Sequence, residues 1–258
     1  MKELSEHLKK ISDAFLTDIK DAFGKSLKSV VLYGPAARGE IYKDHPYINL
    51  LVIVGDNTPS ELARCAKQVK KWHKRLITTP LFLDPSYIES SLDTFPLEFM
   101  DMNSAYNVLY GDDVLNGLVF NVDDVRSQCE RELKGKLIHL RTEYLAIRGN
   151  KKLLIDLINR SLNTFRLVFA GALFLKGCEI PENTQSLIDK VIGEYGLGAT
   201  VFQRLFSIVK GSVKISETEA DELFDLYVEE LDSLSGKIDS MTNDQVVEVD
   251  ENSEETSG

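Results

Sequence analysis

The periodicity of the apolar residues changes near residue 120, and this change limits the folds open to the chain. Before it, short runs rich in β-branched and aromatic residues end at glycine, aspartate or proline, as strands do; they are Ser29–Tyr33, Ile48–Val54 and Thr79–Leu83. After it, apolar residues recur at helical spacing almost without interruption. We therefore expect an α+β fold, with an N-terminal mixed β-sheet domain with flanking helices and a C-terminal helical bundle.

The element boundaries follow from the same patterns. The N-terminal part predicts a helix over 2–23, a helix from a Thr58–Glu61 capping box to about Arg75, a helical turn after Asp84, and extended runs at 96–100 and 108–110. The C-terminal part predicts helices at 122–148, 151–176, 182–195, 199–210 and 216–237. The 151–176 segment is apolar nearly all round, which is typical of the buried centre of a bundle.

Composition then divides the chain into three parts. We expect the α/β domain over residues 1–118 and the helical domain over 119–238. The remaining residues, 239–258, are polar, and the last 19 positions hold six acidic residues and no Lys or Arg. Such a segment cannot bury enough apolar surface to fold, so we expect a disordered acidic tail. The other interpretation is a docking tail for a basic partner.

Charge and hydropathy exclude several function classes. With 41 acidic and 30 basic residues the net charge is −11, which argues against general nucleic-acid binding. A local exception is the basic run Lys67–Arg75, which could hold phosphate or RNA or could be a solvated helix face. The longest apolar run, Leu167–Leu175, is too short to span a bilayer. Three widely spaced cysteines and an N-terminus unlike a signal peptide predict a cytoplasmic protein.

The most informative stretch is a strand, a glycine turn, a short helix, a loop and a second strand. It reads Leu32-Tyr33-Gly34-Pro35-Ala36-Ala37-Arg38-Gly39-Glu40, and the second strand begins near Tyr47-Ile48-Asn49. A turn that opens a helix can present backbone N–H groups to phosphate. Gly34 permits close approach, and Arg38 can add a charged fork. An ordinary tight turn explains the same residues equally well.

These residues resemble the signature of the nucleotidyltransferases of the DNA polymerase β superfamily. That signature is Gly-Ser-x-x-x-Gly after one strand and Asp-x-Asp at the start of the next. The order of an α/β domain and a helical domain also resembles kanamycin-type nucleotidyltransferases. The resemblance covers about residues 25–235 and implies that Gly34, Pro35, Arg38 and Gly39 lie on the substrate-binding side of the site.

The chain departs from that signature where the family binds metal. In the family the two aspartates hold two Mg²⁺ ions, which prefer anionic oxygen ligands. The matching positions are Tyr47 and Asn49, both neutral, and the family serine is Pro35, which lacks a backbone N–H. We therefore expect no confident catalytic residue, no bound metal and a catalytically degenerate site.

Other carboxylates could replace the missing pair. Glu40 and Asp44 lie on the same loop, and Asp56 follows the second strand. The resemblance also implies a third carboxylate on the next strand, but the run Thr79–Leu83 contains none, and Asp84 follows it. Glu98, on a later run, is not a secure match either.

Three functions remain open at this point. The first is a nucleotidyltransferase-like pseudoenzyme that binds a nucleotide, another small molecule or a protein partner, with the ligand in a cleft between the two domains. The second is an active transferase that moves a nucleoside monophosphate from a triphosphate to a small molecule or protein, for which Mg²⁺ and the triphosphate are required. The third is a regulatory or antitoxin-like interaction module, which predicts a homodimer or an exposed apolar patch.

Overall fold

Four strands form one mixed sheet in the order β3-β2-β1-β4. They are β1 (Leu27–Tyr33), β2 (Asn49–Val54), β3 (Leu81–Leu83) and β4 (Tyr106–Gly111). The central strand β1 pairs antiparallel with β2 and β4, and β3 pairs parallel with β2. The computed structural model describes residues 6–40 and 47–241, and it divides the chain into two units, 1–120 and 121–258.

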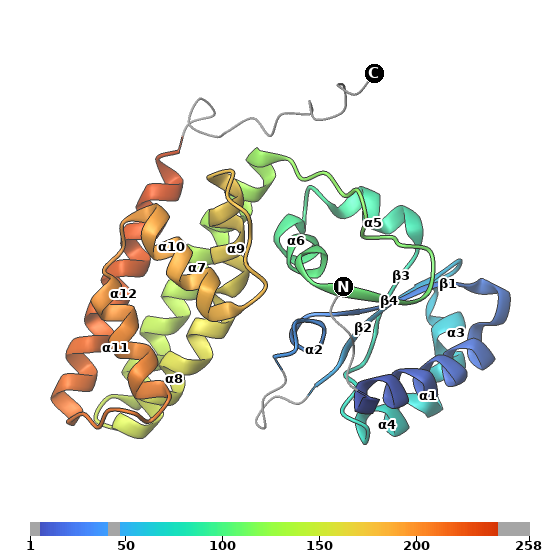
Figure 1. Ribbon diagram of the computed structural model, residues 1–258, viewed down its shortest axis with the longest axis horizontal. Coiled ribbons are helices and arrows are strands. Elements are labelled where there is room, and N and C mark those ends of the chain that lie inside the picture. The colour runs from blue at the N-terminus through green and yellow to red at the C-terminus, as the bar shows by residue number, and fades with distance from the viewer. Residues whose placement is uncertain (1–5, 41–46, 242–258) are drawn as a thin grey trace. The chain divides into compact units, whose positions relative to one another are not determined.

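Helices cover both faces of the sheet in the first unit (Figure 1). Helices α1 (Glu6–Phe23), α3 (Pro59–Leu62) and α4 (Ala66–His73) lie on one side, and α5 (Pro85–Ser91) and α6 (Pro96–Ser104) lie on the other. Val30 and Leu32 pack in one hydrophobic cluster and Val31 in the other, and all three are completely buried. Burial on both faces explains why the strand is continuously apolar rather than alternating.

The described part of the second unit is helical. Its helices are α7 (Val122–Ile147), α8 (Lys151–Thr164), α9 (Arg166–Leu175), α10 (Thr184–Tyr195), α11 (Ala199–Val209) and α12 (Glu217–Asp239). The sheet with flanking helices and the helical C-terminal region confirm the expected α+β fold class.

Three local expectations in the first unit were wrong. The run at 96–100 is not extended but begins α6, because a proline with its fixed φ suits the first turn of a helix. The helix expected from Thr58 to Arg75 is interrupted by a 3₁₀ turn at Ala63–Cys65. Thr58 does not cap it with its side chain; instead its N–H donates to the Asp56 carboxylate.

The single helix expected over 151–176 is two helices that meet at Phe165. Asn163 and Thr164 precede the break, and their side chains donate to the backbone carbonyls of Asn159 and Ser161. Such bonds compete with the regular helical ladder. The second piece, α9, is buried over most of its residues, as its apolar composition predicts.

The C-terminal residues 242–258 lie outside the described residues, so the predicted tail is described only at its start. There α12 continues to Asp239, and Met241 is buried. None of the described helices is both long and apolar enough to cross a membrane. Cys65, Cys129 and Cys178 are free thiols.

We predict that Asp18 stabilises the first unit by joining α1 to α4. Trp72 is buried, its Nε1–H donates to the Asp18 carboxylate at 3.0 Å, and Lys71 pairs with the other carboxylate oxygen at 2.7 Å. Removing the acceptor should therefore lower the free energy of unfolding of Asp18→Ala by about 1.5–3 kcal/mol at neutral pH. Urea unfolding monitored by fluorescence of Trp72, the only tryptophan, measures this.

The stabilisation by Asp18 should depend on pH. Burial opposes ionisation of Asp18, but the hydrogen bonds from Lys71 and Trp72 outweigh it and lower the pKa of its carboxyl. Its stabilisation is therefore present above about pH 4 and is lost as the pH falls through the lowered value. Asp21→Ala, at an exposed position of the same helix, is the control. An equal loss in both variants would contradict the prediction.

Candidate functional site

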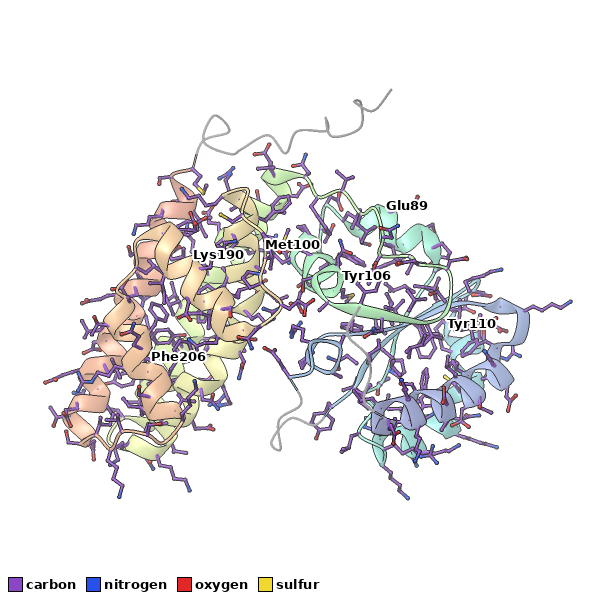
Figure 2. All side chains as sticks on the ribbon, in the orientation of Figure 1. Glu89, Met100, Tyr106, Tyr110, Lys190 and Phe206 are labelled. Atoms are coloured by element: carbon purple, nitrogen blue, oxygen red, sulfur yellow. The ribbon has the colours of Figure 1, made fainter. Side chains whose placement is uncertain are left out.

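The signature residues meet at one edge of the sheet. Tyr33 ends β1 and pairs with Asn49 at the start of β2 and with Tyr106 at the start of β4. Figure 2 labels Tyr106 at this edge and Tyr110 toward the other end of β4. Because β1 runs antiparallel to both neighbours, the turn after β1 and the first residues of β2 and β4 lie together.

The turn after β1 requires glycine for two reasons. Gly34 has φ of +73°, a conformation that side chains rarely adopt. A Cβ at this position would also lie 3.1 Å from the Asn49 amide nitrogen. The turn opens α2 (Pro35–Arg38), a single helical turn closed by Gly39 at φ +76°. Pro35 occupies its first position, so one N–H that a phosphate would meet is missing.

The two positions that correspond to the family metal ligands have different environments. Asn49 is half-buried, and its side-chain oxygen accepts a hydrogen bond of 3.1 Å from the Thr78 hydroxyl. Thr78 also donates to the backbone carbonyl of Ile48, so it fixes the start of β2. Tyr47 is 49% exposed. Neither side chain offers the anionic oxygen that Mg²⁺ prefers.

Arg38 is buried between two carboxylates. Its side chain is 3% exposed, its Nε donates to Glu40 at 3.2 Å, and one terminal nitrogen donates to Asp101 at 3.3 Å. Glu40 is also nearly buried, at 9%, and Asp101 is 17% exposed. Arg38, which we expected to contact phosphate, is therefore paired with carboxylates of the protein itself. One of them is Glu40, which we expected as a substitute metal ligand.

The cluster carries one positive and two negative charges beside the end of β1. Burial of Tyr33, together with the negative charge of Asp101, raises the pKa of the Tyr33 hydroxyl. The charge of Asp101 therefore acts directly on the tyrosine that ends β1.

Two of the other candidate carboxylates, Asp56 and Asp84, lie away from the cluster. Asp56 follows the far end of β2, about 20 Å along the strand from Asn49. Asp84 follows β3, which is parallel to β2, and caps α5 while accepting from Asn57 at 3.1 Å. The third strand carries Leu81, paired with Leu51, and no acid. Glu98 lies on α6 and Asp44 lies outside the described residues.

Sequence reasoning missed Asp101 and Thr78. Asp101 lies just beyond the run that was expected to be extended, and only a helix starting at Pro96 brings it to Arg38. A proline followed two residues later by Glu98 is a helix-start pattern, so a signal was present. Nothing in the sequence marks Thr78, because its role depends on the pairing of Ile48 with Ile77.

Comparison with solved structures shows a similar fold. No protein-family model and no curated protein sequence matches the chain. The solved structure of spectinomycin adenyltransferase AAD(9) from Enterococcus faecialis, with ATP and spectinomycin, covers 90% of this chain and 99% of its own, with a TM-score of 0.55. The fold is that of a nucleotidyltransferase. The sequence identity is 10%, so the likeness establishes the fold and leaves ligand and reaction to the site itself.

We predict that Arg38 is a structural residue of this nucleotidyltransferase fold. Arg38→Met removes the buried charge that bonds both Glu40 and Asp101, and should lower the free energy of unfolding by about 3–5 kcal/mol. In the triple variant Arg38→Met/Glu40→Gln/Asp101→Asn all three charges are gone, so most of the loss should be recovered. Urea unfolding monitored by Trp72 fluorescence measures both.

The matched control is Arg64→Met. Arg64 pairs with Glu61 at 2.8 Å, but its side chain is 47% exposed, so its loss should cost under about 1 kcal/mol. If Arg38→Met were as mild as this control, the cluster would not be the buried, mutually dependent unit described above.

Proposed function

We propose that this nucleotidyltransferase-fold protein is a ligand-binding module that has lost metal-dependent transfer, and that its ligand is a nucleotide bound without Mg²⁺. The observation that carries the proposal is the pairing at the sheet edge. Neutral Asn49 is held by Thr78, and the nearby carboxylates Glu40 and Asp101 are paired with buried Arg38. Transfer in this fold family requires carboxylates that clamp two metal ions. The proposal therefore depends on the charges at the sheet edge rather than on the shape of the fold.

The arrangement of acids supports the loss of metal chemistry. A metal at this edge would need anionic oxygens converging on one space, and the guanidinium of Arg38 already lies between the two that are near. Within residues 6–40 and 47–241, no three His, Cys, Asp or Glu side chains are grouped so that they could hold a metal ion. Electrostatic stabilisation supplies most of the rate in phosphoryl-type transfer, so its loss is expected to cost many orders of magnitude.

Two features support a nucleotide as the ligand. The adenyltransferase of similar fold was solved with ATP, which makes adenine nucleotides the first class to test. Tyr47 is an exposed aromatic at the edge of the sheet, and an aromatic ring offers a stacking surface to any base. Pro35, which has no backbone N–H, weakens the contribution of phosphate groups. Affinity should therefore come mainly from the base and sugar.

An active transferase is the second candidate, and one observation favours it. Glu40 and Asp101 lie on the same guanidinium, so they would face a common space if Arg38 moved away. Such a site would transfer a nucleoside monophosphate in the presence of Mg²⁺, to a small molecule or a protein.

We predict that ATP binds equally with and without metal. Calorimetric titration in Mg²⁺ and in EDTA should give Kd values within about threefold, and AMP should bind within about fivefold of ATP. Tyr47→Ala should weaken binding by about tenfold, the effect of removing one stacking contact, while Tyr47→Phe should bind like the natural chain.

The variant Tyr47→Asp/Asn49→Asp tests the assignment of the metal positions. It replaces both neutral side chains with carboxylates, and we expect Mg²⁺ to tighten its ATP binding by about tenfold or more. Mg²⁺-dependent ATP binding by the natural chain, with release of pyrophosphate, would support the active transferase instead. A stable dimer that binds no nucleotide would support the interaction module.

A further inference from the structure

A hollow of about 560 Å³ lies between α1 and the end of α4, in the first unit. It is lined by Lys10, Ile11, Ala14, Lys74, Arg75 and Leu76, and we call it the basic hollow. Figure 1 shows α1 and α4 side by side on the same face of the sheet. The contact of the Phe15 and Trp72 rings, with centroids 4.6 Å apart, holds the two helices together.

The cations around the basic hollow are largely uncompensated. Lys10 and Lys74 are exposed and make no ion pair with any residue that the structure describes. Arg75 lies in the field of Asp18, which is already bonded to Lys71 and Trp72. The helix α4 itself contains no acid. On a chain of net charge −11, this is a local concentration of positive charge.

Helix-dipole stabilisation accounts for only part of this arrangement. Lys74 and Arg75 follow the C-terminus of α4, where cations are favourable. Lys10 lies in the first half of α1, toward the positive end of that helix, and gains nothing from its dipole. Its position in the lining of the basic hollow therefore needs another explanation.

Leu76 adds a cost to stability. It is the one residue other than glycine with a positive φ, +64°, in the described part of the chain. The N–H of Ile77 donates to Trp72 and that of Leu76 to His73, which is a helix-ending motif that favours glycine at this position. A leucine there costs about 1–2 kcal/mol, yet its side chain is 38% exposed at the basic hollow.

We propose that the basic hollow binds single-stranded nucleic acid, with phosphates on Lys10, Lys74 and Arg75 and an unstacked base against Ile11 and Leu76. The charge requires a polyanion, and the apolar floor requires a flat apolar group beside it, which together describe a nucleotide strand. A duplex keeps its bases stacked inside, so no base could contact Ile11 or Leu76. A lipid surface is too flat to enter the basic hollow. Exposed Lys67 and Lys70 continue the positive charge along α4 for neighbouring phosphates.

This inference is independent of the proposed nucleotide site at the sheet edge, since it uses none of its side chains. It also qualifies the expectation that nucleic acid is an unlikely partner. That expectation came from the net charge, which does not report how charge is distributed over the surface.

The test is fluorescence anisotropy of a labelled single strand of about 12 nucleotides, RNA or DNA, titrated with the full chain at several salt concentrations. We expect the variant Lys10→Gln/Lys74→Gln/Arg75→Gln to bind about tenfold more weakly or worse. Its salt slope should fall by about 2, the value for three lost phosphate contacts on a single strand.

The control variant is Lys152→Gln/Lys210→Gln/Lys214→Gln, which removes the same charge from exposed lysines of the helical unit. It should bind like the natural chain. Leu76→Gly distinguishes an effect on binding from an effect on folding. It should weaken binding of the strand by about threefold or more, and it should not lower the unfolding midpoint.

Four results would overturn the proposal: no binding by the natural chain at about 50 mM salt, equal loss in the control variant, tighter binding of the matching duplex, or binding of anionic phospholipid vesicles that abolishes binding of the strand. Weak binding of the duplex together with loss in the basic-hollow variant alone would support it.

Discussion

The geometry at the edge of this sheet depends on a buried guanidinium between two carboxylates. Arg38 ties the short helix after β1 to Glu40 on the following loop and to Asp101 on α6. A buried ion pair adds little net stability, because desolvation offsets the attraction. It specifies geometry instead, since any arrangement that separates these three groups breaks the ion pairs of a buried guanidinium. The glycine turn is joined to this cluster by the backbone hydrogen bond from the Arg38 N–H to the Gly34 carbonyl.

The same cluster limits the chemistry. A divalent metal and a guanidinium compete for the same carboxylates, and here the guanidinium is part of the fold. Asn49 adds no negative charge at this edge, and its side-chain oxygen accepts a hydrogen bond from Thr78. In this nucleotidyltransferase fold, a tyrosine and an asparagine occupy the two positions that the family resemblance assigns to metal ligands. The basic hollow, with its exposed cations and the positive φ of Leu76, is a separate surface.

The sequence predicted the fold better than the site. Hydrophobic periodicity and glycine punctuation located β1, β2 and the helices of the second unit, because those patterns are set by burial. The ion cluster could not be predicted, since it joins residues 63 positions apart and depends on α6 being a helix rather than a strand. The hydrogen bond from Thr78 to Asn49 likewise follows from strand pairing, which no local pattern reveals. The Pro96 start signal was present but was outweighed by the apolar run after it.

The central claim is that no divalent metal binds at the sheet edge, and manganese tests it most directly. Crystals soaked with ATP and Mn²⁺ would locate the metal by its anomalous scattering. The account predicts no manganese bonded to Asn49, Glu40 or Asp101, and Arg38 still paired with both acids. Manganese coordinated by Glu40 and Asp101, with Arg38 displaced, would contradict it and would show that the fold has rebuilt a catalytic metal site.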